Sequence, residues 1–163
     1  EVFVSDGYLN HRVAVFDRAG RFLRKWGEQG GGNAGLEIPH GIAIRGEHAY
    51  VADREHGRIQ VTDLAGGNPI NWKPDGLRGH PYSVKALTDG RVVSIEGRDN
   101  ADRSGALVRI WRPDGTIERS LDIALPGDGT SLGHDLAVGP DGMAYAADVY
   151  GNRVAKFDLA PRK

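Results

Sequence analysis

Three segments of the sequence begin in a similar way and hold a histidine or a tyrosine at the same place. They are residues 38–44, 80–86 and 132–138, with His40, Tyr82 and His134 at the shared position. Neutral imidazole is a common zinc ligand, and three histidines that leave one position open are typical of catalytic zinc sites. His40 and His134 are therefore candidate metal ligands, although a histidine at such a place can also line a channel without binding metal.

A repeat of about 47 residues determines where these side chains lie. An apolar run that ends in aspartate, followed by a second run that contains arginine, recurs at Asp6, Asp53 and Asp148, which are separated by 47 and 95 residues. A more divergent copy fills the gap at residues 91–111, with an unusual loop at 97–105. Self-similarity at such a period is typical of folds in which each repeat is one supersecondary unit.

Each copy alternates apolar and polar residues over short runs bounded by Gly, Asn and Asp, which predicts strands joined by hairpins. Gly20, Gly115 and Gly142 stand where such hairpins turn. About four strands per repeat is the size of a propeller blade. The chain is therefore predicted to be all-β, a single partial β-propeller domain with about 3.5 four-stranded blades. The expected blades are 1–35, 36–78, 79–125 and 126–163. A β-sandwich also has short strands, but it does not explain the repeat.

The repeat also predicts where the candidate ligands meet. His40 and His134 are 94 residues apart and lie on alternate blades, which are about 120° apart in a ring of six. A third histidine two blades earlier would complete a set of three aimed at the channel axis. It would lie about 95 residues before His40, outside this sequence. We expect the missing blades to come from a longer chain, of which this sequence is a fragment.

We expect the repeated aspartate and arginine to pair with each other and stabilise a hairpin, rather than to take part in catalysis. They are six residues apart in the first copy and five in the second and fourth, a spacing at which a carboxylate and a guanidinium can fix a hairpin. The remaining histidines lie in polar or turn-like contexts, where we expect surface or turn positions rather than metal ligands. They are His11, His48, His56 and His80.

Composition excludes several classes of function. The 21 Lys+Arg residues are scattered among 22 Asp+Glu, so no basic face predicts nucleic-acid binding. There is no cysteine and hence no disulfide or thiolate chemistry. No apolar run approaches the roughly 20 residues of a membrane helix, and the sequence starts with neither an initiator methionine nor a signal peptide.

Several longer motifs resemble one family. They are Val4-Ser5-Asp6-Gly7-Tyr8, Trp26-Gly27-Glu28, Ile38-Pro39-His40, the run VADREHGRIQ from Val51 to Gln60, and Gly133-His134-Asp135. In this order, along essentially the whole chain, they are similar to the peptidyl-α-hydroxyglycine α-amidating lyases (peptidylamidoglycolate lyases), which are NHL-repeat β-propellers. The resemblance implies six blades and a zinc ion held by three histidines in the central channel.

The resemblance also implies roles for residues at matching positions. His40 and His134 would bind Zn²⁺, Tyr8 would be the catalytic tyrosine, and Arg54 a catalytic arginine on the substrate side. Asp135 matches an aspartate beside the last zinc ligand, near a structural Ca²⁺ in the family. The third zinc ligand and a second catalytic arginine belong to blades that this sequence does not contain.

The sequence departs from the family pattern at two places, Gly133 and His56, and neither is one of the residues expected to bind zinc or act in catalysis.

The implied reaction cleaves the N–Cα bond of a peptidyl-α-hydroxyglycine to give a peptide amide and glyoxylate. The complete protein would then be a carbon–nitrogen lyase with a peptide substrate, whereas the fragment alone would be inactive. A secreted or periplasmic location is implied by the resemblance only.

Two other functions compete with this one. The first is a non-catalytic NHL propeller that binds a peptide or a protein as a scaffold. The second is a lactonase-like hydrolase with a carboxylate-bound metal. Histidine and tyrosine at the channel position disfavour the hydrolase, and a scaffold has no need of histidines on alternate blades.

Overall fold

The computed structural model describes residues 1–30, 32–73, 79–97, 105–123 and 131–160. In these ranges all regular structure is β-strand, and the strands of each sheet pair antiparallel. The predicted all-β class is confirmed. Since the described residues form no helix, they include none that could cross a membrane. Most of the loop at 97–105, and the expected blade limits near residues 78 and 125, lie outside the described residues.

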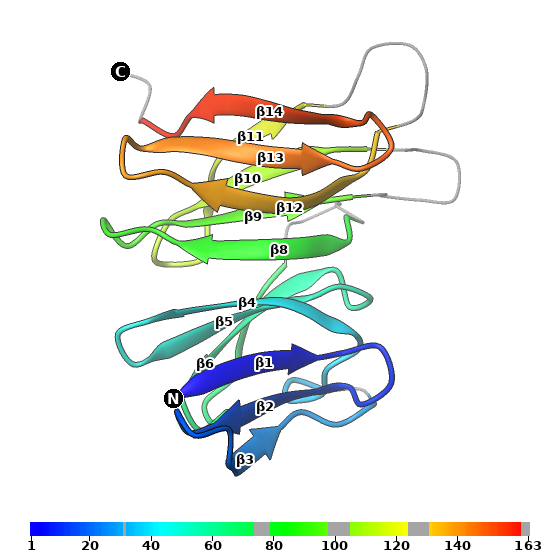
Figure 1. Ribbon diagram of the computed structural model, residues 1–163, viewed down its shortest axis with the longest axis vertical. Helices are drawn as coiled ribbons and strands as arrows, with labels where there is room; N and C mark the ends of the chain where they lie inside the picture. The colour runs from blue at the N-terminus through cyan, green and yellow to red at the C-terminus, as the bar shows by residue number, and fades with distance from the viewer. Residues whose placement is uncertain (31, 74–78, 98–104, 124–130, 161–163) are drawn as a thin grey trace.

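Four sheets follow one another along the chain, from the blue sheet at the bottom of Figure 1 to the red strands at the top. The first contains β1 (Val2–Asp6), β2 (Arg12–Phe16) and β3 (Phe22–Trp26). The second contains β4 (Pro39–Arg45), β5 (His48–Asp53), β6 (Arg58–Asp63) and β7 (Ile70–Trp72). The third contains β8 (Pro81–Ala86), β9 (Val92–Glu96), β10 (Leu107–Trp111) and β11 (Ile117–Asp122). The fourth contains β12 (Gly133–Val138), β13 (Met143–Asp148) and β14 (Arg153–Asp158).

In each sheet the strands pair in sequence order, which is the arrangement of a propeller blade. The first strands of the last three sheets, β4, β8 and β12, lie side by side in that order. They all begin at the end of the sheets that is on the right in Figure 1. We call this end the proximal rim, and the end at which they finish the distal rim. The arrangement is a partial β-propeller, as predicted.

The core consists of three apolar clusters, each between two consecutive sheets. Side chains that alternate along the strands meet face to face there, as expected when every strand buries residues of period two. Between the first and second sheets lie Val13, Val15, Trp26, Leu36, Ala49 and Val51. Between the second and third lie Tyr50, Ala52, Ile59, Val61, Trp72, Val84, Val92 and Trp111. Between the third and fourth lie Leu87, Val93, Ile95, Val108, Ile110, Leu136, Ala144, Ala146 and Leu159.

The predicted Asp–Arg pairs fix the hairpins at the proximal rim. The Arg Nε donates to the carboxylate at 2.9 Å for Asp6 and Arg12, and at 2.8 Å for Asp53 and Arg58. The same bond joins Arg153 to Asp148 at 3.1 Å. In the divergent third sheet a buried pair of Glu96 and Arg109 replaces this lock, with 2.5 Å between the oxygen and Nε.

Arginines also join neighbouring sheets at the distal rim. Arg24 of the first sheet donates from Nη2 to the Leu64 carbonyl at 2.9 Å. Arg45 donates to the Thr88 carbonyl and Arg91 to the Leu159 carbonyl, each at 2.8 Å. Each consecutive pair of sheets is therefore tied by at least one charged donor to a main-chain acceptor, a type of hydrogen bond stronger than a neutral one.

Candidate active site at the proximal rim

The strand pairing shifts by one residue at each shared channel position. The shifts fall between Pro39 and Gly41, Pro81 and Ser83, and Gly133 and Asp135. His40, Tyr82 and His134 are the residues left without a partner in the ladder. A β-bulge of this kind bends the strand and redirects a side chain, and bulges are frequent beside active sites.

The three redirected side chains converge. The ring centroids of His40 and His134 are 4.9 Å apart, those of His40 and Tyr82 4.9 Å, and those of Tyr82 and His134 4.8 Å. The two imidazoles are nearly perpendicular, at 84°. The expected meeting of His40 and His134 is therefore seen, although they come from different sheets and are 94 residues apart in the sequence.

One hydrogen bond selects the tautomer of His40. Its Nδ1 lies 2.8 Å from the main-chain oxygen of Tyr82, which can only accept, so Nδ1 must carry the proton. The lone pair is then on Nε2, the atom a metal would use. Burial is the main cause that lowers the pKa of His40. The charges of His134 and Arg54 lower it further, whereas the hydrogen bond to the Tyr82 carbonyl and the charge of Asp135 raise it. The neutral, metal-binding form is favoured.

Tyr8 and Arg54 reach the same place from the loops that follow β1 and β5. The Tyr8 hydroxyl is 3.2 Å from His40 Nε2, and Arg54 Nη1 donates to the Tyr8 oxygen at 3.2 Å. Because Nδ1 of His40 is the donor to Tyr82, the Tyr8 hydroxyl must donate to Nε2. The expected clustering of Tyr8, Arg54, His40 and His134 at one rim is observed, while their chemical roles remain predictions.

The backbone holds these two loops close to β4. The Arg54 N–H donates to the Ile38 carbonyl at 3.1 Å, and Ile38 has a φ of +59°, an unusual value for a β-branched residue. Such strain is typical of functional sites. A side chain at Gly7 would place its Cβ 2.3 Å from the Pro39 oxygen, so only glycine allows the Tyr8 loop to approach so closely.

Glu55 and His80 also belong to the site, and the sequence did not indicate either of them. Glu55 Oε1 accepts from Arg54 Nε at 2.7 Å. His80 Nδ1 donates to the Arg54 carbonyl at 3.1 Å and lies 3.8 Å from Glu55 Oε2. The only available signals were adjacency to Arg54 and a position two residues before Tyr82. By contrast, His56 binds the lock residue Asp53 at 2.7 Å, in a turn as expected.

Asp135 follows His134 but lies mostly exposed, 3.7 Å from Lys85. Burial raises its pKa, but the opposing hydrogen bonds from Ser83 and the Leu136 N–H and the charges of Lys85 and His134 together lower it. Its side chain is thus an ionised carboxylate beside the histidines. Calcium binding near it remains a prediction.

The two histidines fit a zinc ion as part of a ligand set. Tetrahedral zinc with Zn–N bonds of about 2.0–2.1 Å places two imidazole centroids about 5 Å apart, close to the 4.9 Å between His40 and His134. Neither nitrogen of His134 is hydrogen-bonded to a residue in the described ranges. The described residues contain no group of three or more His, Cys, Asp or Glu that could hold a metal, so two ligands are all that this part of the chain provides.

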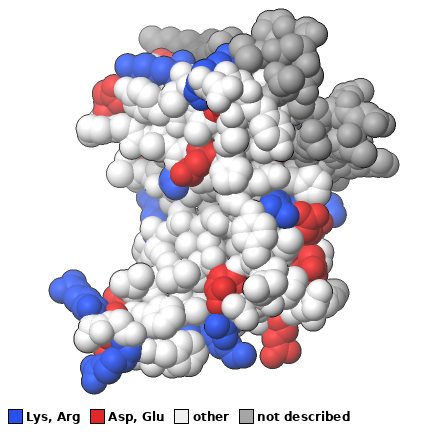
Figure 2. All heavy atoms as spheres, turned by 45° about the vertical axis from the view of Figure 1, so that its right-hand side comes forward, with Lys and Arg blue, Asp and Glu red and all other residues white. Residues whose placement is uncertain are grey.

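The charge around the site is mixed. Figure 2 turns the proximal rim towards the viewer and shows Lys, Arg, Asp and Glu in small groups of both signs. Arg54, with its side chain 15% exposed, is a cation whose charge acts on His40. Burial lowers its pKa, but the hydrogen bond and charge of Glu55, with Tyr82 and Tyr8, raise it overall, so Arg54 stays charged.

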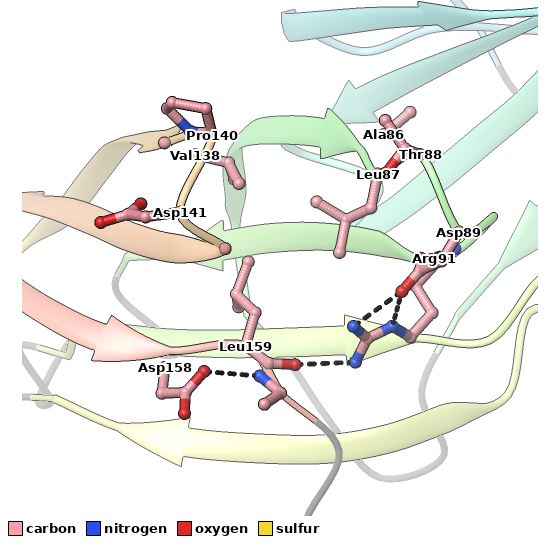
Figure 3. Close-up of a pocket in the computed structure, with 13 residues that line it drawn as sticks. Ala86, Leu87, Thr88, Asp89, Arg91, Val138, Pro140, Asp141, Asp158 and Leu159 are labelled. Atoms are coloured by element: carbon pink, nitrogen blue, oxygen red, sulfur yellow. Dashed lines mark hydrogen bonds and ion pairs between the residues drawn. The ribbon is translucent and has the colours of Figure 1, made fainter.

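A separate pocket of about 620 Å³ lies at the distal rim, between the third and fourth sheets. Figure 3 shows the Arg91 guanidinium directed at Asp89 and at the Leu159 carbonyl rather than into free space. Asp158 accepts from the Ala160 N–H at 2.8 Å. Because these charged groups already have partners, we assign no chemistry to this pocket.

Comparison with known proteins supports the predicted resemblance. The NHL repeat family model matches residues 36–61. The chain is 30% identical over 185 residues to the peptidylglycine alpha-amidating monooxygenase of Rattus norvegicus, covering 99% of the chain and 17% of that protein. It is 24% identical over 172 residues to the probable peptidyl-alpha-hydroxyglycine alpha-amidating lyase pgal-1 of Caenorhabditis elegans, covering 97% of the chain and 46% of that protein. The chain thus spans less than half the length of these relatives.

Among solved structures, the fold is similar to that of virginiamycin B lyase from Staphylococcus aureus, with a TM-score of 0.67 at 11% identity. The match covers 93% of this chain and 47% of that one. At this identity the likeness concerns the fold alone. The chain contains an NHL repeat, has the fold of a partial propeller, and has relatives among the enzymes of peptide amidation.

Proposed function

We propose that the complete protein containing this chain is a zinc-dependent lyase that cleaves the N–Cα bond of a peptidyl-α-hydroxyglycine, giving a peptide amide and glyoxylate. The observation that supports this most is the convergence of His40, His134, Tyr8 and Arg54 at the proximal rim, from four separate loops or strands. The similarity to amidating enzymes adds the reaction class.

His40 and His134 would hold the zinc together with a third ligand from outside this sequence. When bound, zinc supplies Lewis-acid stabilisation of negative charge on an oxygen, worth several kcal/mol in such sites. The hydrogen bond from His40 Nδ1 to the Tyr82 carbonyl keeps the lone pair on Nε2, where zinc would replace the hydrogen bond from Tyr8.

Arg54 would bind the carboxylate of the α-hydroxyglycine. Its guanidinium stays charged and is held by Glu55 through Nε, which leaves the Nη atoms to bind an anion. One of them, Nη1, points to the Tyr8 hydroxyl at 3.2 Å. The carboxylate would therefore lie next to the tyrosine that has to reach the neighbouring α-hydroxyl.

Tyr8 would move the proton that the reaction requires. In its deprotonated form it would accept the α-hydroxyl proton while the Cα–O bond becomes a carbonyl, with Arg54 Nη1 donating to its oxygen. The electrons of the N–Cα bond pass to the amide nitrogen, and the same proton then goes from Tyr8 to that nitrogen. No other reactant is needed, since the products contain all the atoms of the substrate.

The direct test uses the purified complete protein. We expect about one zinc per chain by elemental analysis, and glyoxylate together with peptide amide from a dansylated peptide that ends in α-hydroxyglycine. His134→Ala should lower both, whereas His48→Ala should lower neither, because His48 is an exposed histidine at the distal start of β5. Bound zinc without glyoxylate would favour the scaffold function, and a wild-type protein without zinc would refute the proposal.

A further inference from the structure

Tyr82 occupies the channel position of the sheet between the two histidine-bearing sheets. It is the second residue of β8, and it lies at the same kind of bulge as His40 in β4 and His134 in β12. The proposed reaction uses both histidines and the Tyr82 carbonyl but assigns nothing to the Tyr82 side chain. Its contacts nevertheless extend to both histidines and to Arg54.

The Tyr82 ring contacts both imidazoles. Its centroid is 4.9 Å from that of His40, at an interplanar angle of 69°, and 4.8 Å from that of His134, at 41°. Aromatic contacts at these separations are favourable and restrict the rotamers of both partners. Since the two histidines come from different strands, a ring that touches both limits how far each can turn away from the other.

The same ring also contacts Arg54. The guanidinium carbon lies 5.3 Å from the Tyr82 centroid and 5.2 Å from the Tyr8 centroid, so Arg54 is in cation–π range of two aromatic rings. Glu55 fixes the Nε edge of the guanidinium at 2.7 Å. Loss of the Tyr82 ring would remove one of these restraints and allow the guanidinium to tilt.

The hydroxyl group of Tyr82 has no comparable role. Within the described ranges it forms no hydrogen bond to another side chain or to the main chain, whereas the main-chain oxygen of the same residue accepts from His40. Substitution of the side chain leaves that oxygen in place. The ring and the carbonyl can therefore be separated by experiment.

We infer that Tyr82 is a positioning residue, whose ring holds His40 and His134 at the spacing for a shared metal and holds Arg54 against Tyr8. This inference rests on the proposed zinc site. It concerns the arrangement of the site and assigns no proton transfer to Tyr82.

The test compares three variants of the complete protein. Tyr82→Leu removes the ring, and its zinc dissociation constant, measured by competition with a chelator, should rise about 10–100-fold, as for other groups that orient metal ligands. Tyr82→Phe keeps the ring and should retain wild-type zinc affinity. Tyr145→Leu is the matched control, because Tyr145 also has a cation near its ring, Lys156 at 5.3 Å, but lies on β13 outside the site. It should bind zinc like the wild type.

Steady-state kinetics at saturating zinc distinguish a positioning role of Tyr82 from a simple loss of folded protein in the variant. Tyr82→Leu should raise the KM for the α-hydroxyglycine peptide, because Arg54 is less well held, whereas partial unfolding would lower kcat at constant KM. If the leucine variant does not fold, Tyr82→Gln replaces it with the same expectations. A leucine or glutamine variant with wild-type zinc affinity and KM would overturn the inference, as would a phenylalanine variant that loses zinc affinity. Failure of the wild type itself to bind zinc would instead refute the proposed function.

Discussion

Replacing Asp53 by asparagine should destabilise the protein far more than the same change at Asp6, although both residues form the same hairpin lock. The Asp53 side chain is fully buried and accepts from the Glu37 N–H at 2.7 Å, from His56 at 2.7 Å and from Arg58 at 2.8 Å. Asparagine would leave the buried Arg58 without its counter-charge. Removing one partner of a buried ion pair costs about 3–5 kcal/mol.

The corresponding pair at Asp6 lies near solvent. Its side chain is 31% exposed and that of Arg12 is 33% exposed, and a solvent-accessible pair of this kind contributes about 0.2–1 kcal/mol. The difference between the two variants should thus be at least about 2 kcal/mol. Asn10, which also donates to Asp6 at 3.0 Å, can still bond to an asparagine oxygen.

Urea denaturation of the complete protein, followed by tryptophan fluorescence, measures this difference. Trp26 and Trp72 report on the first two sheets, because both are buried in the clusters on either side of the second sheet. The two variants should differ in transition midpoint at a similar slope. Equal losses for Asp6→Asn and Asp53→Asn, or a larger loss for Asp6→Asn, would refute the argument that burial sets the strength of the lock.

Three further outcomes are expected. Tyr8→Phe should lower kcat for α-hydroxyglycine peptides by about 10²–10⁴ with zinc content unchanged, and normal turnover would exclude Tyr8 as the base. Arg54→Ala should chiefly raise KM, measured with the same peptides, and Arg54→Lys should restore it only in part, because a lysine lacks the two-pronged geometry. Although burial raises the pKa of Asp148, hydrogen bonds from the Leu132 and Gly151 N–H groups and the Arg153 side chain lower it overall below 3.8. A lowered folded-state pKa gives stability that is present above the unfolded pKa and is lost as the pH falls through the folded one. The urea midpoint of the wild type should therefore fall below about pH 4 more steeply than that of Asp148→Asn.

The sequence predicted the parts of the fold that depend on repetition. The alternation of apolar and polar residues at a 47-residue period gives the strands, and positive φ values at Gly20, Gly115 and Gly142 agree with the predicted turns. Repeat register was also sufficient to bring His40 and His134 together, because equivalent residues of all blades face the same axis.

Features that depend on local backbone geometry could not be read from the pattern. The bulges that redirect His40 and Tyr82 leave no mark in the periodicity, since the strand resumes its alternation afterwards. Glu55 and His80 enter the site because main-chain hydrogen bonds fold the Arg54 loop against its neighbours. In the third sheet, Glu96 performs the function of the repeated aspartate with a longer side chain, which conceals the equivalence.

The arginine hydrogen bonds at the distal rim hold neighbouring blades at a fixed spacing, and this spacing does not depend on which amino acid provides the accepting carbonyl. Arg45 binds the carbonyl of Thr88, an exposed residue whose side chain takes no part in the bond. Any amino acid offers the same carbonyl, so mutations can accumulate at the acceptor positions while the donors remain fixed. The distal surface is thus free to diversify during evolution, or to accept grafted loops, without a change in the angle between blades that brings the two histidines together.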